Sequence, residues 1–179
     1  CVREGGFPRP ADGAPRPRVP AALWRATLLA RLGLPTVAVS DALTGAYEGT
    51  DYAVALPEGE TTLHVGAPSP ALDRWLATQN ATQWALLAAA NPWSARCDDD
   101  ANRAAHTALR ALLTQRGLPL PDAENRTAEA GWTEPSLLCA GLTAEEALRI
   151  GAAFGQNAVL TGEAGGTAQL RWCVRRQTD

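Results

Sequence analysis

A chain of 179 residues with 46% hydrophobic content is the size of one domain with a full core, and none of its apolar runs reaches the roughly eighteen residues that a membrane span needs. All 16 basic residues are arginines, and the absence of lysine excludes Schiff-base chemistry and a P-loop phosphate site. Residues 1–40 hold six arginines against two acids, so the net charge of −3 divides into +4 there and −7 over residues 41–179, which argues against a nucleic-acid surface on the main body.

The N-terminal part differs in composition from the rest. Five prolines fall within residues 1–20 among glycine and arginine, and such a segment buries too little apolar surface to order itself. We therefore predict a flexible Arg/Pro-rich arm there, which could contact a protein partner. Residues 21–40 should hold a short helix, ended by Gly33 and Pro35, and a connector. Residues 41–176 are then a single globular domain.

The first half of this domain begins with a predicted hairpin. Residues 47–56 and 61–65 read as its two strands, because apolar side chains alternate with smaller ones along the first. Ser69 is typical of a helix N-cap, since Pro70 follows it at the first helical position, and this helix should run to about Gln79. Residues 84–90 form a continuous apolar run of strand length.

The second half starts with the strongest helix prediction, over residues 98–116. Acids lie at its N-terminal end, and Gly117 is a typical stop. Thr143-x-x-Glu146 is a capping box that opens a further helix, which Gly155 should close. Three short stretches predict the remaining strands, at residues 137–140, 158–161 and 169–174.

These elements follow one another in the order ββαβαβαββ. We expect an α+β, or mixed α/β, domain with a single sheet of about five to six strands and three helices packed on it. The N-terminal helix and the arm would precede it.

Four groups of residues stand in a characteristic order between residues 46 and 174. They are Tyr47-x-x-Thr50-x-Tyr52, Ala90-Asn91-Pro92-Trp93-Ser94 with Asn102, Trp132-x-Glu134-Pro135-Ser136, and Phe154-Gly155-Gln156-Asn157-Ala158. In this order and spacing they resemble an uncharacterised bacterial family, domain-of-unknown-function family 3293. The resemblance implies a small soluble bacterial domain, and it brings no known activity, cofactor or partner.

The polar residues of these groups fall at the ends of predicted elements. If the strands concerned are neighbours, in a parallel or mixed arrangement, their ends meet at one rim of the sheet, where open sheets bind ligands. We therefore predict a pocket for a small polar ligand, nucleotide-like or sugar-like, with the two tryptophans as stacking walls. The predicted ligand-binding residues are Asn91, Trp93, Ser94, Asn102, Trp132, Ser136, Gln156 and Asn157.

Glu134 is the candidate catalytic residue, as a general acid or base. It lies between Trp132 and Pro135, just before a buried strand, where partial desolvation would raise its pKa. The alternative is a buried carboxylate that accepts hydrogen bonds from the backbone or from an arginine. In that case the amides only cap helices and form turns, and the chain is a non-catalytic accessory or regulatory domain that binds a partner through its arm.

The cysteines and histidines do not suggest a metal centre or a nucleophilic triad. His64 and His106 have no elbow motif near them, and Cys97 and Cys139 lack the spacing of zinc ligands. We expect no metal and no cofactor. Since no C-x-x-C pair occurs, the thiols are typical of a reduced, cytoplasmic protein.

Overall fold

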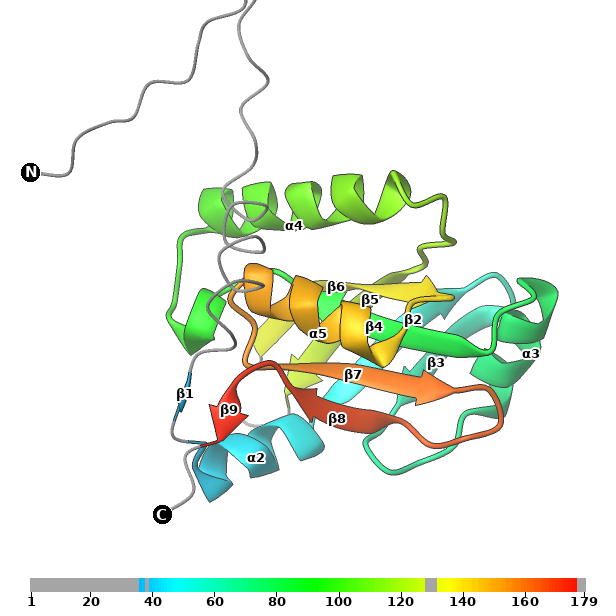
Figure 1. Cartoon of the computed structure of the whole chain (residues 1–179), viewed down its shortest axis with the longest axis horizontal. Coiled ribbons are helices and arrows are strands. Elements are labelled where there is room, and N and C mark those ends of the chain that lie inside the picture. Colours follow the sequence, from blue (N-terminus) through cyan, green and yellow to red (C-terminus); the bar gives the residue numbers. More distant parts are fainter. Residues whose placement is uncertain (1–35, 38, 128–131, 177–179) are drawn as a thin grey trace, which may run out of the picture.

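The computed structural model describes residues 36–37, 39–127 and 132–176; the predicted arm and the predicted helix that follows it lie outside these ranges. The described part forms one curled antiparallel sheet of seven strands, covered by helices on both faces (Figure 1). Its strands are β2 (Asp51–Leu56), β3 (Gly59–Leu63), β4 (Gln83–Ala88), β5 (Asp122–Thr127), β6 (Trp132–Ala140), β7 (Ala158–Glu163) and β8 (Gln169–Trp172).

The strands lie in the order β3-β2-β5-β6-β4-β7-β8 across this sheet. A short parallel pair, β1 (Thr36–Val37) with β9 (Arg175–Arg176), forms a second sheet. No described helix is long and apolar enough to cross a membrane. The described α-helices are α2 (Asp41–Glu48), α3 (Pro70–Thr78), α4 (Asp99–Thr114) and α5 (Ala144–Ala153).

The three helices predicted for the body begin at or next to their predicted first residues. The side chain of Ser69 caps α3, and that of Asp98 caps α4 by accepting from a backbone N–H three residues on. Thr143 and Glu146 form both bonds of the capping box at the start of α5. These contacts span three residues, so the local sequence is enough to specify them.

The mixed α/β class is confirmed, but the sheet is larger than predicted. The strand β5 was missed because its sequence, Asp-Ala-Glu-Asn-Arg-Thr, has no apolar alternation. The predicted strand over residues 47–56 is wrong at its start: Ser40 accepts a bond from the backbone of Leu43 and begins a helix that includes Tyr47. The sheet therefore has seven strands, and four described α-helices surround it.

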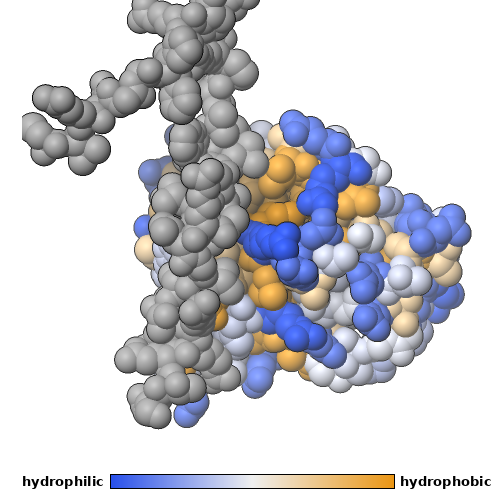
Figure 2. All heavy atoms as spheres, in the orientation of Figure 1, coloured by the Kyte–Doolittle hydropathy of each residue, from blue (hydrophilic) through white to orange (hydrophobic). Residues whose placement is uncertain are grey.

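The central strand β4 is buried on both faces, which explains its continuous apolar sequence. Ala85 and Leu87 belong to the core beneath α4 and α5. Trp84 and Leu86 belong to a second core, with α3 and the β2–β3 hairpin. On the face shown in Figure 2, hydrophobic surface in the region of α4 and α5 is interrupted by hydrophilic side chains.

The two edges of the sheet approach each other. Beyond β3, Val65 pairs with Ala168, which directly precedes β8, and the N–H of Gly66 donates to the Ala168 carbonyl at 2.7 Å. Asp73 of α3 accepts a bond at 2.9 Å from the N–H of Gly165, in the β7–β8 turn. The sheet is thereby held in a curl, and the residues that follow β3 are paired with the opposite edge.

The expectation of a parallel or mixed arrangement is wrong. β4 pairs with β6 and β7 in antiparallel register, and Ala88 at the end of β4 lies opposite Ser136. In an antiparallel pair the end of one strand lies beside the beginning of its neighbour. That arrangement alone brings the residues after β4 next to the first half of β6.

Candidate functional site

The chain leaves β4 in an unusual backbone conformation. Asn91, Trp93 and Ser94 all have positive φ, at 47°, 57° and 58°. Such angles are rare for residues other than glycine, although asparagine tolerates them, and they persist only where surrounding contacts hold them. The contacts around this turn therefore identify the part of the molecule that holds it.

Asn91 is the centre of these contacts. Its backbone N–H donates to Oδ1 of Asn102 in α4 at 2.9 Å, and its Nδ2 donates to Oε1 of Glu134 in β6 at 2.7 Å. Its own Oδ1 accepts from the N–H of Cys97 at 3.0 Å and from Nδ2 of Asn102 at 3.1 Å. One buried amide thus joins β4, the following turn, α4 and β6.

Glu134 is half-buried beside this amide. Burial raises the pKa of its carboxyl group, and the hydrogen bond from Asn91 opposes that rise. Among the described residues, Asn91 is the one hydrogen-bond donor to Glu134, and it donates to Oε1. The carboxylate is therefore oriented by one bond while its second oxygen keeps its capacity to accept.

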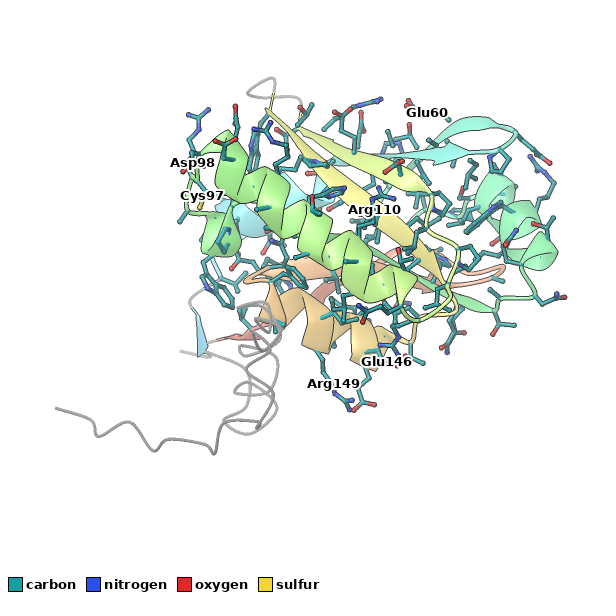
Figure 3. All side chains as sticks on the ribbon, turned by 90° about the horizontal axis from the view of Figure 1, so that it is seen from above. Glu60, Cys97, Asp98, Arg110, Glu146 and Arg149 are labelled. Atoms are coloured by element: carbon teal, nitrogen blue, oxygen red, sulfur yellow. The ribbon has the colours of Figure 1, made fainter. Side chains whose placement is uncertain are left out.

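A pocket of about 310 Å³ opens over these three side chains. Trp132, which is 41% exposed, forms one wall. Figure 3 shows Cys97, a further lining residue, beside Asp98 at the N-terminal end of α4. The charged residues that line it, apart from Glu134, are Arg96, Asp99 and Arg103.

The two arginines of the pocket differ in their partners. Arg103 forms an ion pair with Asp100, within the first turns of α4. Arg96 has no hydrogen bond or ion pair to any residue in the described ranges. Of the two pocket arginines, Arg96 is the one whose charge has no ion-pair partner within the described ranges.

Other predicted residues lie behind the pocket. Nε2 of Gln156 donates to the carbonyl of Ala90 at 3.0 Å, and Nδ2 of Asn157 donates to Oγ of Ser94 at 2.8 Å. Ser136 is buried in β6. Gln156 and Asn157 support the turn after β4, Ser136 donates to Asn125 in β5, and none of the three lines the pocket over Glu134.

Trp93 also belongs to this support. Its backbone N–H donates at 2.6 Å to the carbonyl of Gly155, at the end of α5, and the residue is 39% exposed. Of the predicted ligand-binding residues, the structure brings Asn91, Asn102 and Trp132 to the pocket with Glu134. The others lie beneath it or beside it.

Sequence reasoning left Tyr47, Asn125 and Arg96 out of the site. Tyr47 hydrogen-bonds with the side chains of Asn157 and Ser94, although the sequence places it at the start of a predicted strand. Asn125 accepts a bond from Oγ of Ser136 at 2.9 Å, on the strand that was missed. The Tyr-x-x-Thr-x-Tyr motif could have indicated that Tyr47 belongs to the site. No sequence motif indicated this for Asn125 or Arg96.

No three His, Cys, Asp or Glu side chains gather closely enough to hold a metal ion in the described part of the chain. His64 is exposed and lies 3.4 Å from Asp51, while His106 lies on α4 with its Nδ1 buried and without a hydrogen-bond partner. The expectation of no metal and no cofactor stays a prediction.

Fold and site together define a mixed α/β domain in which amides hold a carboxylate at the end of a central strand. Residues 87–159 match the model of a family described as "Protein of unknown function (DUF3293)", which confirms the resemblance over this stretch. No curated protein and no solved structure matches the chain. The matched stretch includes the three bonded residues Asn91, Asn102 and Glu134, whereas Tyr47 lies outside it.

Proposed function

We propose that the pocket binds a small polar metabolite and that Glu134 acts there as an acid or base. The observation that carries this proposal is a half-buried carboxylate with a raised pKa in the wall of a pocket, with one of its oxygens held by Asn91. Desolvation that moves a carboxyl pKa upward is a common property of catalytic acids and bases, because it brings the group nearer to working pH.

The other walls suggest what the ligand carries. Arg96 offers a guanidinium group for a phosphate or carboxylate, and the ring of Trp132 offers a flat surface for a heterocycle or a sugar. A nucleotide-like or sugar-phosphate-like molecule combines both features. In a hydrolytic reaction, Glu134 would take a proton from the attacking water and return it to the leaving group as the bond to that group breaks.

A second candidate function is a non-catalytic interaction domain, and one observation favours it. Asn91, Asn102, Gln156 and Asn157 each donate a side-chain hydrogen bond to another part of the protein, so their amides are already engaged. This reduces their role in direct ligand recognition. Under the first proposal they instead keep Glu134 and the turn after β4 in place, and the ligand contacts fall to Arg96, Trp132 and Glu134.

Thermal-shift measurements with matched probes test the binding site. Adenosine monophosphate and glucose 6-phosphate are compared with adenosine and glucose, which lack the anionic group. We expect a phosphate-bearing probe to raise the Tm of the wild type and of Arg149→Ala, since Arg149 is an exposed residue of α5 paired with Glu145. The shift should disappear in Arg96→Ala.

The role of Glu134 is tested by following the bound probe by NMR. Hydrolysis is expected in the wild type and should be lost in Glu134→Gln, while the thermal shift persists, because the substitution keeps the shape of the side chain. Glu163→Gln, at an exposed carboxylate on β7, is the control and should keep both properties. A destabilised Glu134→Gln protein, with no probe shifting either protein, would leave the interaction domain as the better account.

A further inference from the structure

Glu134 lies between the outer pocket and two smaller hollows. These measure about 20 Å³ and about 40 Å³. Each is large enough for at least one water molecule, for which about 10–15 Å³ of such space is needed. Glu134 is the one described residue that lines the outer pocket and both hollows. Glu134 therefore borders these two hollows as well as the outer pocket.

Three polar side chains line both hollows together with Glu134: Tyr47, Tyr52 and Asn125. The side-chain oxygen atoms of two of them already form hydrogen bonds. The hydroxyl of Tyr52 donates to the backbone carbonyl of Tyr47 at 2.9 Å, and Oδ1 of Asn125 accepts from Ser136 at 2.9 Å. Tyr47 is the remaining candidate for a hydroxyl group directed toward Glu134.

The hydrogen bonds around Tyr47 indicate where its proton goes. Asn157 donates to Oγ of Ser94, so the hydroxyl proton of Ser94 is available for the oxygen of Tyr47. The phenol oxygen thus accepts from its polar neighbours, and its own proton is left for the hollow. On the opposite side, Asn91 occupies Oε1 of Glu134 and leaves the other carboxylate oxygen as an acceptor.

We propose that Tyr47 is a positioning residue for Glu134: its hydroxyl donates to a water molecule in the hollow, and that water donates to the carboxylate oxygen that Asn91 leaves free. The proposal rests on the proposed function of Glu134. This role for Tyr47 accounts for the first tyrosine of the Tyr47-x-x-Thr50-x-Tyr52 motif. It also gives Asn157 and Ser94, which hydrogen-bond to Tyr47, a function behind the pocket. Asn91 and Tyr47 then orient the carboxylate from two sides.

This arrangement affects the titration of Glu134. Hydrogen bonds to the charged form of a carboxyl group lower its pKa, and a bond through water acts in the same direction. Tyr47 also faces Tyr52 and the thiol of Cys173. Across the outer pocket, Glu134 faces the ionisable groups of Arg96, Cys97, Asp99 and Arg103.

The test is an NMR titration of Glu134 in protein that carries ¹³C-labelled glutamate, with the signal assigned by its loss in Glu134→Gln. In Tyr47→Phe, we expect the pKa of Glu134 to rise by about half a unit, because a donor to its charged form is removed. Thr127→Val is the matched control. It removes a hydroxyl from the wall of one hollow, and that hydroxyl donates to the Trp132 carbonyl at 3.4 Å. An unchanged pKa in Tyr47→Phe, or an equal rise in Thr127→Val, would overturn the proposal.

A reverse measurement keeps Tyr47 in place. The chain has 2 tyrosines, so ionisation can be followed by tyrosinate absorbance. Burial raises the pKa of both, and strongly that of Tyr52, so Tyr47 should ionise first. Glu134→Gln should lower the pKa of Tyr47, because a neighbouring negative charge is removed; an unchanged midpoint would contradict the inference.

These readouts need neither ligand nor turnover. If the titrations are coupled but no probe binds, the proposed function fails and the pairing of Tyr47 with Glu134 stands. If probes bind but the titrations are independent, the pocket stands and only the role of Tyr47 fails.

Discussion

At the scale of single residues, Asn91 connects the end of β4 to other segments of the chain through hydrogen bonds. Its side chain accepts two hydrogen bonds and donates one, and its backbone has a φ that few residues tolerate. Each partner comes from a different segment of the chain. Removal of this amide would leave several half-buried polar groups without partners, which costs more than the bonds themselves contribute.

We expect Asn91→Ala to lower the free energy of unfolding by about 2–3 kcal/mol, measured by urea denaturation. Asn91→Gly is the matched variant. It loses the same hydrogen bonds but adopts a positive φ without strain, so it should be less destabilised by about 1 kcal/mol. Equal losses in the two variants would show that the backbone at this position carries no strain.

The pH dependence of Glu134→Gln gives a second prediction at this scale. Burial holds the pKa of Glu134 above its ordinary value of 4.5, so folding favours its protonated form. The stability that this adds is complete below the ordinary pKa and is lost as pH rises through the raised pKa. Glutamine does not titrate, so the Tm of Glu134→Gln relative to wild type should increase between pH 4 and pH 8. A difference in Tm that stays constant over this range would contradict the assignment of a raised pKa.

At the scale of elements, the end of α5 is fitted against the turn that follows β4. Gly155 has a φ of 73°, and a Cβ atom there would lie 2.6 Å from Cβ of Pro92. The helix needs glycine at this position both for its backbone angle and for the close approach of the turn. The conformation of the turn is thereby linked to the packing of a helix that lies roughly 60 residues later in the sequence.

Gly155→Ala should therefore cost more than an ordinary change at a positive φ. Gly165→Ala is its control, because Gly165 has a φ of 76° and no atom lies within 4 Å of its would-be Cβ. We expect Gly165→Ala to lose about 1 kcal/mol from backbone strain, and Gly155→Ala to lose about 1–3 kcal/mol more from the collision. Chemical denaturation of both variants measures the difference in their free energies of unfolding. Equal losses would show that the turn after β4 moves aside at no energetic cost.

The capping box of α5 gives a prediction that depends on local contacts alone. Thr143→Ala removes the acceptor for the N–H of Glu146 and should cost about 1 kcal/mol. Thr107→Ala, at an exposed position inside α4, should be neutral or slightly stabilising, because alanine has the higher helix propensity. Thermal melts of the two variants make the comparison.

At the scale of the whole molecule, two cores on opposite faces of one sheet hold the fold together without a metal centre in the described residues. Purified protein should therefore contain no stoichiometric zinc, and a chelator should leave its melting curve unchanged. Elemental analysis provides the check. One zinc per chain, with unfolding in the presence of a chelator, would point to ligands from outside the described ranges.

The sequence by itself determined the features that depend on neighbours a few residues apart. The caps at Ser69 and Thr143 need only a side chain and an N–H three residues on, so the sequence alone predicts them, and the structure confirms both. The continuous apolar run over residues 84–90 likewise indicated the strand β4. Four residues that line the pocket were also predicted to be members of one site: Asn91, Asn102, Trp132 and Glu134.

Only the tertiary structure decided which segments meet. The polar segment β5 is a strand because β2 and β6 supply backbone partners on both sides, which its own side chains do not signal. Antiparallel pairing set the end of β4 beside Glu134. The same pairing of distant segments placed Asn157 behind the pocket, where it contacts Tyr47. Hydrogen bonds and packing between residues far apart in sequence selected these arrangements, and no local pattern of residues records such contacts.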